Sequence, residues 1–376
     1  MAATDVVPHW LGRVLRACAA LFGGLLAAGT AKAVDLPEDR AEAMIHVYDG
    51  GGVKAIGPAV LVRKRFAERY SLSASYYVDA VSNASIDVVT TASPFKERRT
   101  AVDLTLDHVV RDGIVSVGLS HSKEPDYVAQ AFSLDTSQEV FGGMTTVSVG
   151  FTRAVDKVGK ANEAAWADEV THWQWRAGIT QILSPRWIAS ANFEAISDSG
   201  YLGSPYRVAR VFGAAVPERN PRTRTSRAIK LRVIGDLGSR DAVRAEARFF
   251  SDTWAIKAST VEAGYSRYFG NPSGNRWLAD GFVRAHSQRK ALFYSDNAST
   301  ETIYISRNRQ LSTFKSTSLG GRVTYALGRV GSRFDVKLVG SYERVAFRYK
   351  DFTDVRTGAP YSFNANLLQV FASANF

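Results

Sequence analysis

The chain closes on the stretch Leu368-Gln369-Val370-Phe371-Ala372-Ser373-Ala374-Asn375-Phe376, in which every second side chain counted back from the last residue is apolar. Successive side chains of a β-strand point to opposite faces. One face of this strand therefore carries only Phe, Ala, Val and Leu, whereas Asn375, Ser373 and Gln369 lie on the other. The first face suits lipid and the second suits water, which predicts a membrane strand. By itself the pattern is also compatible with the edge of a soluble β-sandwich.

The opposite end of the chain favours the membrane, because residues 1–33 have the layout of a secretory signal peptide. Arg13 and Arg16 precede a weakly apolar run, and Ala31-Lys32-Ala33 supplies a small-x-small cleavage site. The apolar run is too short to span a bilayer. An exported chain whose last strand ends in Phe376 resembles bacterial outer-membrane barrels, which show such a strand to the barrel assembly machinery.

The composition of the mature chain, residues 34–376, narrows its chemistry. The only cysteine of the full chain, Cys18, lies in the predicted signal peptide. The mature chain is therefore expected to have no disulfide and no Cys-ligated metal. Removal of the signal peptide leaves 44 basic against 35 acidic residues, a net charge of +9. This charge suits anionic solutes or the phosphates of lipopolysaccharide, whereas export argues against nucleic acid as a partner. The full chain contains 7 Trp, 15 Tyr and 20 Phe, which fit the aromatic girdles of a membrane barrel.

Alternation of apolar and polar side chains recurs from end to end. In the segment Tyr70–Val78, Ser71, Ser73 and Ser75 share one face and larger apolar side chains share the other, and in Val243–Phe249 the polar face is charged. A charged face must look into a wet lumen, since an Arg at the bilayer midplane costs about 2–4 kcal/mol. A soluble two-layer sandwich would show the same stripes with inside and outside exchanged.

The spacing of these segments distinguishes a membrane barrel from a soluble sandwich. We expect strands at 41–49, 54–64, 70–81, 99–110, 113–122, 126–135, 143–153, 170–182, 187–197, 227–237, 241–252, 254–267, 276–288, 314–327, 332–345 and 365–376. Because 126–135 and 254–267 are weak, 14 to 18 strands are compatible with the sequence. Tight turns near Phe66–Arg69, Arg111–Gly113, Ser184–Arg186, Gly238–Arg240 and Gly328–Ser332 alternate with long polar segments at Ser82–Arg98, Ala154–Glu169, Asp198–Arg227, Arg289–Thr313 and Ala346–Asn364. Short periplasmic turns and long outer loops are typical of outer-membrane barrels.

Four motifs resemble those of a bacterial family of predicted outer-membrane barrels, the domain-of-unknown-function family number 3570. They are Asp79-Ala-Val-Ser-Asn-Ala-Ser-Ile-Asp87 running on to Ala92-Ser93-Pro94, Thr180-Gln-Ile-Leu-Ser-Pro185, Gly200-Tyr-Leu-Gly-Ser-Pro-Tyr-Arg207 and Pro217-Glu-Arg-Asn-Pro-Arg-Thr-Arg224. The resemblance covers nearly all of the mature chain. It implies a fold and a location, and it brings no activity, substrate or residue role.

The segment Asp198–Arg227 is the strongest functional candidate. It contains Arg207, Arg210, Arg219, Arg222, Arg224 and Arg227. Folded into the lumen, these arginines would form a cationic constriction that favours anions, and at the surface they would bind lipopolysaccharide phosphates. The plain alternative is a loop braced by ion pairs with lumen acids such as Asp103, Asp107 and Glu246. Arg244 and Arg248, on either side of Glu246, allow the same alternatives.

The sequence offers little support for an enzyme. The mature chain has five histidines, His46, His108, His121, His172 and His286. The neighbours His121-Ser122 and His286-Ser287 diverge in a strand, as do Asp107 and His108, so none forms a catalytic pair. We expect His46 and His172 to be solvated or interfacial, and we expect no catalytic residue, no metal site and no cofactor.

These observations predict an all-β protein: a signal peptide at 1–33 and a single transmembrane antiparallel β-barrel of about 16 strands at 34–376, in the bacterial outer membrane. A barrel of this size has room for a water-filled channel. The expected function is porin-like passage of small polar solutes, with a preference for anions. A closed barrel that docks periplasmic proteins is the second hypothesis, and an outer-membrane hydrolase is the third. Outer-membrane lipid, lipopolysaccharide and the assembly machinery are the expected partners.

Overall fold

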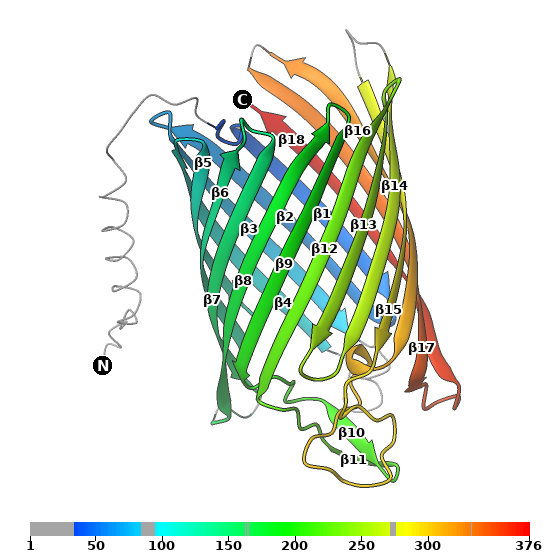
Figure 1. Ribbon diagram of the computed structural model, residues 1–376. Coiled ribbons are helices and arrows are strands. Elements are labelled where there is room, and N and C mark those ends of the chain that lie inside the picture. The colour runs from blue at the N-terminus through cyan, green and yellow to red at the C-terminus, as the bar shows by residue number, and fades with distance from the viewer. Residues whose placement is uncertain (1–33, 84–94, 162, 164, 271–275, 332) are drawn as a thin grey trace, which may run out of the picture.

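The computed structural model describes residues 34–83, 95–161, 163, 165–270, 276–331 and 333–376. Within these residues, strands of one kind follow one another and close into a single antiparallel barrel (Figure 1). The predicted signal peptide, residues 1–33, and residues 84–94 of the expected loop Ser82–Arg98 lie outside the described part of the chain.

Sixteen strands form the barrel, as the sequence predicts. They are β1 (Arg40–Gly50), β2 (Val53–Phe66), β3 (Tyr70–Asn83), β4 (Phe95–Val110), β5 (Gly113–Lys123), β6 (Tyr127–Val140), β7 (Thr145–Gly159), β8 (Ala167–Ser184), β9 (Trp187–Gly200), β12 (Thr223–Gly238), β13 (Asp241–Asp252), β14 (Lys257–Gly270), β15 (Arg276–Arg289), β16 (Phe314–Val330), β17 (Phe334–Thr353) and β18 (Pro360–Asn375). Each pairs with its neighbours in the chain, and β1 pairs with β18 to close the ring. A separate hairpin, β10 (Val208–Val211) and β11 (Ala214–Pro217), and a 3-10 turn, η1 (Arg309–Leu311), lie in the two longest connections.

The apolar stripe of the last strand faces outward. Leu368 and Val370 are 47% and 49% exposed, and Ile45, opposite Val370 on β1, is 46% exposed. The same exposure is found around the barrel, at Val60, Val62, Leu72, Leu104, Val147, Val149, Ile179, Leu231, Val261, Val283 and Leu338. Ser71 and Ser73, on the opposite face of β3, are buried. An apolar outer surface around a polar interior rules out the soluble sandwich and fits hydrocarbon outside the barrel.

No helix in the described part of the chain has the length and hydropathy that a membrane-spanning helix requires.

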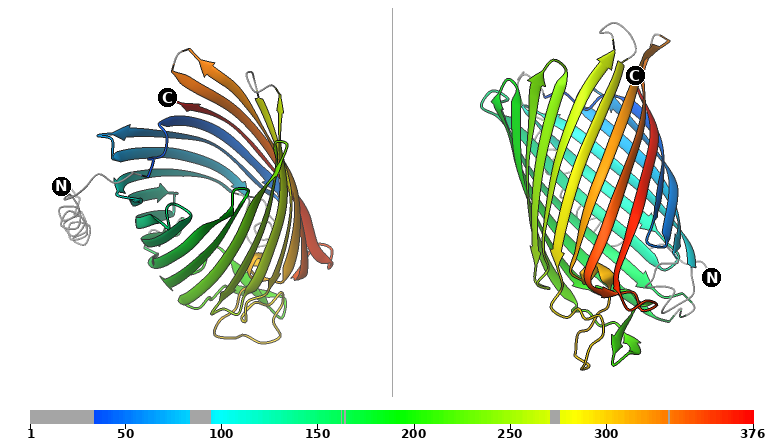
Figure 2. Two further views of the ribbon diagram at one scale, coloured as in Figure 1. Left: turned by 45° about the horizontal axis from the view of Figure 1, so that its top comes forward. Right: turned by 90° about the vertical axis from the view of Figure 1, so that its right-hand side faces the viewer.

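The two ends of the barrel differ in their connections. The first residue of β1 and the last of β18 lie at the same end, where two-residue to four-residue turns join β2 to β3, β4 to β5, β6 to β7, β8 to β9 and β12 to β13. Several of these turns hold residues at positive φ, such as Ala67 at 49°, Arg111 at 54° and Gly238 at 79°. Residues 201–222 and 290–313, the two longest connections, lie at the other end (Figures 1 and 2). The long-loop end is therefore the outer side of the membrane.

The prediction of a long loop at Ala346–Asn364 is wrong, because β17 runs on to Thr353 and β18 already begins at Pro360. In this extension the stripe inverts. Phe347 and Phe363 pair across the two strands and stack inside the barrel, while Arg348 faces outward opposite Ser362. A polar outer face at the end of a strand has the composition of a loop, which explains the error.

An aromatic cluster fills part of the lumen at the long-loop end. Its buried residues are Trp254, Ile256, Ala291, Tyr294, Leu311, Tyr349, Phe352 and Tyr361. The connection between β15 and β16, which contains η1, packs its apolar side chains onto the inward faces of β17 and β18. This cluster and the hydrogen bonds of the loops fix the outer mouth on one side of the barrel.

Candidate functional site

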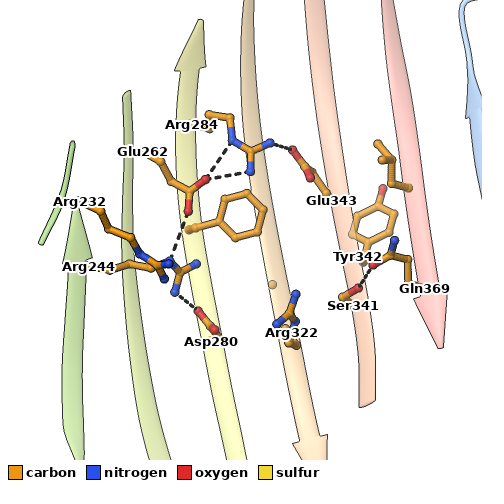
Figure 3. A pocket seen from close by; sticks show the side chains of 13 residues that line it. Arg232, Arg244, Glu262, Asp280, Arg284, Arg322, Ser341, Tyr342, Glu343 and Gln369 are labelled. Carbon is orange, nitrogen blue, oxygen red and sulfur yellow. Dashed lines mark hydrogen bonds and ion pairs between the residues drawn. The ribbon is translucent and has the colours of Figure 1, made fainter. Parts of the chain in front are cut away.

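Charged side chains from several strands meet on the inner wall of the barrel. The sequence alternates charged and apolar residues along β12 to β17, so the side chains that do not face lipid gather in the lumen. A cavity of about 360 Å³ lies against this wall, lined by Arg232, Arg244, Arg284 and Arg322 and by Glu262, Asp280 and Glu343 (Figure 3). Among the described residues it is the best candidate for contact with a solute.

Glu262 is the centre of an ion-pair network in this cavity. Its carboxylate accepts hydrogen bonds from Arg284 Nε at 2.9 Å and from Arg244 Nε at 3.3 Å (Figure 3). Arg244 also donates to Asp280 at 2.5 Å, and Arg284 donates to Glu343 at 3.1 Å. The network ties β13, β14, β15 and β17 together across the wall.

A glycine makes room for the network. Gly264 lies opposite Arg244 in the register of β13 and β14. A Cβ at this position would come within 2.5 Å of the Arg244 guanidinium carbon. Any other residue would therefore push Arg244 away from Glu262 and Asp280.

Arg232 and Arg322 differ from these paired arginines. Each faces a carboxylate in the strand register: Arg232 lies opposite Glu246, and Arg322 lies opposite Asp280. Glu246 instead pairs with Lys230 at 2.9 Å, and Asp280 with Arg244. Neither Arg232 nor Arg322 has a hydrogen bond or an ion pair within the described part of the chain, and both are exposed to the lumen (Figure 3).

The wall of β12 to β17 is consequently rich in positive charge at this cavity. Its lining contains four cations, Arg232, Arg244, Arg284 and Arg322, and three carboxylates, Glu262, Asp280 and Glu343.

The wall of β2 to β8 has the opposite balance. Arg63 pairs with Asp107 at 3.0 Å, and Arg176 pairs with Asp135 at 2.8 Å. Asp103 is held only by hydroxyl groups, those of Ser75 and Ser120. The two walls of the lumen therefore carry opposite excess charge.

The predicted arginine loop lies mostly beyond the strands. Residues 201–222 and 290–308 pack into an outer lobe, joined by bridges between Val211 and Ala298 and between Arg219 and Ile305 (Figure 1). Arg210 lies in β10, and Arg207 lies just before it.

Three of the predicted arginines brace this end of the barrel. Arg222 donates two hydrogen bonds of 2.7 Å to Asp168 on β8, and Arg219 donates to Glu301 at 2.6 Å. Arg224 donates to Asp252 at 2.6 and 2.8 Å. The bracing carboxylates thus belong to loops and strand ends rather than to Asp103, Asp107 and Glu246.

The other predicted arginines lie on the strands. Arg248 faces the lumen, where its guanidinium lies 3.8 Å from Glu194, and Arg244 belongs to the network described above. Arg227 lies on β12 with its side chain on the outer face, since it shares that face with Ile229 and Leu231.

The expectation that His46 and His172 are solvated or interfacial is wrong. His172 Nδ1 lies 2.7 Å from Asp198 and its Nε2 lies 3.0 Å from Asp156. His46 Nε2 lies 3.0 Å from Asp79. No local sequence pattern predicts these contacts. Asp156 and Asp198 lie on the two strands next to that of His172, 16 and 26 residues away, and Asp79 lies on β3, two strands from His46 on β1.

In this arrangement His172 is not available as a catalytic base. Both ring nitrogens of His172 are held by carboxylates, so no lone pair is free to take a proton from a nucleophile. In the described residues, no three His, Cys, Asp or Glu side chains are arranged to hold a metal ion.

Residues 79–344 match the family described as "Protein of unknown function (DUF3570)". No curated protein matches the sequence. A bacterial polysaccharide outer membrane secretin superposes with a TM-score of 0.53 at 8% identity, over 91% of this chain and 100% of its own. CdiB from Escherichia coli gives a TM-score of 0.50 at 11% identity, over 89% of this chain and 63% of its own. At these identities the likeness shows a shared fold, the barrel of outer-membrane proteins.

Proposed function

Because the chain belongs to the DUF3570 family of proteins of unknown function and folds as a bacterial outer-membrane barrel, we propose that it is a porin-like channel for small polar solutes. The observation that carries this proposal is the pair of lumen arginines, Arg232 and Arg322, which are exposed to the lumen and face carboxylates that other cations occupy. A closed structural barrel has no need of exposed, uncompensated charge in its interior.

The proposed path for anions runs along the wall of β12 to β17. An anionic group that enters there meets Arg232 and Arg322 without having to break an existing ion pair. The acidic wall, with Asp103, Asp107 and Asp135, leaves the opposite side of the same solute free to carry positive charge or hydroxyl groups. Charged groups lining a pore act in this way in other selective channels.

Planar-bilayer conductance in a salt gradient tests the proposal. The wild-type barrel is expected to conduct with a reversal potential that shows anion preference. The double variant Arg232→Gln/Arg322→Gln is expected to shift the reversal potential toward cations, while Asp103→Asn on the opposite wall shifts it toward anions. A silent barrel, cation preference in the wild type, or a reversal potential that neither variant changes would contradict the proposal.

A closed barrel that serves as a structural or docking partner is the second candidate. The aromatic cluster favours it, because Phe352, Tyr294 and their neighbours pack inside the outer mouth and hold the connection between β15 and β16 there. The two candidates differ in one measurable property, since a closed barrel passes no current in the wild type.

A hydrolase has less support. It would need a nucleophile, a base and an acid within hydrogen-bond reach of one another. Both ring nitrogens of His172 are held by carboxylates, and the hydrogen-bond partners of His46 are Asp79 and Tyr77 rather than a serine or threonine.

A further inference from the structure

Five basic side chains form a row on the outer surface of the barrel, at the long-loop end. In the register of the strands Arg227 lies opposite Ser251, Ser251 opposite Lys257, and Lys257 opposite Arg289. Two residues before Arg289 on β15, Ser287 lies opposite Lys315, and Lys315 lies opposite Arg348. All five cations are exposed. We call these residues, Arg227, Lys257, Arg289, Lys315 and Arg348, the outer basic row.

Their outward direction follows from the lipid-facing side chains on the same strands. Ile229, Phe249, Val261, Val283 and Leu319 are between 48% and 67% exposed and lie an even number of residues from a member of the row or from its serine partner. Residues an even number apart along a strand share one face. The row therefore extends the lipid-facing surface toward the outer mouth, outside the lumen and outside the site of the proposed channel.

The row places like charges against each other. Lys257 and Arg289 are direct cross-strand neighbours, and so are Lys315 and Arg348. Such pairs destabilise a sheet unless an anion lies between them. Within the described residues, none of the five cations forms an ion pair, and the positions that complete the row are serines.

Two basic residues elsewhere on the outer surface lie next to acidic ones. Lys54 on β2 pairs with Asp49 at 3.1 Å, and Lys157 on β7 lies opposite Glu169 on β8. A run of five neighbouring cations without an ion pair lies on the side formed by β12 to β17. It points to an anion supplied from outside the protein.

The height of the row matches the boundary of the membrane. Ten residues separate Arg227 from Leu237, the last exposed apolar residue of β12, and at about 3.4 Å per residue and a tilt of about 40° they span about 26 Å. The apolar band of an outer-membrane barrel is about 25 Å tall. The row therefore lies where the hydrocarbon of the outer leaflet ends and its headgroups begin.

A groove completes the site. A cavity of about 680 Å³ opens on this surface, between Phe193, Ile229 and Phe249 on the membrane side and Arg227, Lys257 and Arg289 on the outer side. Ser251, Ser259 and Ser287 also line it. Small hydroxyl side chains next to apolar ones suit a glycolipid whose acyl chains lie along the wall while its sugars and phosphates rise to the cations.

We propose that the outer basic row and this groove bind the phosphorylated lipid A portion of lipopolysaccharide, with phosphates bridging the Lys257–Arg289 and Lys315–Arg348 pairs. Guanidinium and ammonium groups bind phosphate by charge-assisted hydrogen bonds. This inference does not depend on whether the lumen conducts.

The test measures the affinity of the purified barrel in detergent for fluorescently labelled lipid A. Each basic residue near an anionic lipid surface contributes about fivefold in affinity. The triple variant Lys257→Gln/Arg289→Gln/Lys315→Gln is therefore expected to bind roughly 100-fold more weakly. Lys54→Gln/Lys123→Gln/Lys157→Gln, which removes three outward charges at the same end of the barrel, is expected to change the affinity by less than about threefold.

Two further sets of binding measurements identify the ligand group that is recognised and show whether a loss of affinity comes from misfolding. Lys257→Arg/Lys315→Arg keeps the charges and is expected to bind as the wild type does. Lipid A without its phosphates is expected to bind the wild type weakly, and inorganic phosphate is expected not to compete. Equal losses in the two triple variants, tight binding of the dephosphorylated lipid, or competition by inorganic phosphate at similar concentration would overturn the proposal.

Discussion

The backbone N–H of Phe376 donates a hydrogen bond of 3.1 Å to the main-chain carbonyl oxygen of Asp39, which ties the last residue of the chain to the residue before β1. The carboxylate of Asp39 accepts hydrogen bonds from Lys64 Nζ and from the backbone N–H of Arg65, both at 2.6 Å. Lys64 Nζ also lies 4.9 Å from the centre of the Phe376 ring. Asp39 thus joins the last residue of the chain, through its main-chain carbonyl, to the end of β2, through its buried carboxylate.

Asp39→Asn should weaken the barrel and remove part of its acid sensitivity. Burial alone would raise the pKa of Asp39, but the hydrogen bonds from Lys64 and Arg65 lower it overall, below its usual 3.8. The ionised form therefore stabilises the folded barrel fully above about pH 4, and this contribution is lost as the pH falls through the lowered pKa. Unfolding in detergent at neutral pH should show a loss of roughly 1–2 kcal/mol, shrinking near pH 2.5. A loss of the same size at both pH values would contradict the account.

Phe376→Ala tests the predicted assembly signal. The Phe376 ring touches that of Phe334, with centroids 5.9 Å apart, and is 39% exposed, so its contribution to stability is about 1 kcal/mol. We expect the variant to reach the outer membrane in several-fold lower amount while the refolded protein stays nearly as stable as the wild type. Phe334→Ala removes the same ring contact without changing the terminus. Equal amounts of the two variants in the membrane would mean that Phe376 acts through packing alone.

Strand number and strand faces follow from the sequence because a lipid-facing stripe repeats with a period of two along the whole barrel. The prediction failed where the stripe inverts, at Arg348 and Ser362, since a strand with basic residues outside looks like a loop. The predicted loop Ala154–Glu169 is likewise too long, since β7 runs on to Gly159 and β8 begins at Ala167. Arg227, predicted at the boundary between the loop Asp198–Arg227 and the strand 227–237, lies inside β12, which begins at Thr223. These differences fall at the outer ends of strands, where the surface of the barrel passes from hydrocarbon to headgroups and water.

The lumen site was only partly predictable. Alternation places Arg244, Glu246 and Arg248 on one inner face, but the partners of each depend on registers that no local pattern encodes. Arg244 reaches Asp280, which is 36 residues away and two strands across the barrel. Arg232 and Arg322 were missed because an uncompensated arginine can be recognised only when the neighbouring carboxylates are seen to be occupied.

Glu262→Gln should increase anion preference. The change deprives Arg244 and Arg284 of the carboxylate that they share, so two more cations face the solute path. Planar-bilayer measurements should show a reversal potential shifted toward anions, with a stability loss of about 1–3 kcal/mol. Glu301→Gln removes the same charge from the outer lobe, where Glu301 pairs with Arg219, and should leave the reversal potential unchanged. Shifts of equal size in both variants would assign the selectivity to net charge rather than to the lumen wall.

Arg224→Gln should be the most costly of the loop-arginine substitutions. The side chain of Asp252, which Arg224 contacts at 2.6 Å, is 0% exposed. Removing the partner of a buried carboxylate costs about 3–5 kcal/mol. Arg222→Gln breaks a pair whose arginine is 60% exposed, and such pairs contribute only about 0–1 kcal/mol. Unfolding of the two variants in detergent at neutral pH checks the difference, and similar losses would argue against a buried anchor at the base of the loop.

Phe352→Ala distinguishes between the two proposed functions, a channel and a closed barrel. Phe352 is 0% exposed and packs against Tyr349 and Tyr361, with ring centroids 5.7 Å apart in each pair, and under the guanidinium of Arg307 at 4.4 Å. Truncating such a ring costs about 3–5 kcal/mol locally, which should release the connection between β15 and β16 to added protease while β-strand circular dichroism is retained. If the wild type conducts, the variant should conduct at least as much, whereas current that appears only in the variant would identify the aromatic cluster as a plug. Phe212→Ala, at a ring of the outer lobe that is 76% exposed, should change neither protease sensitivity nor current.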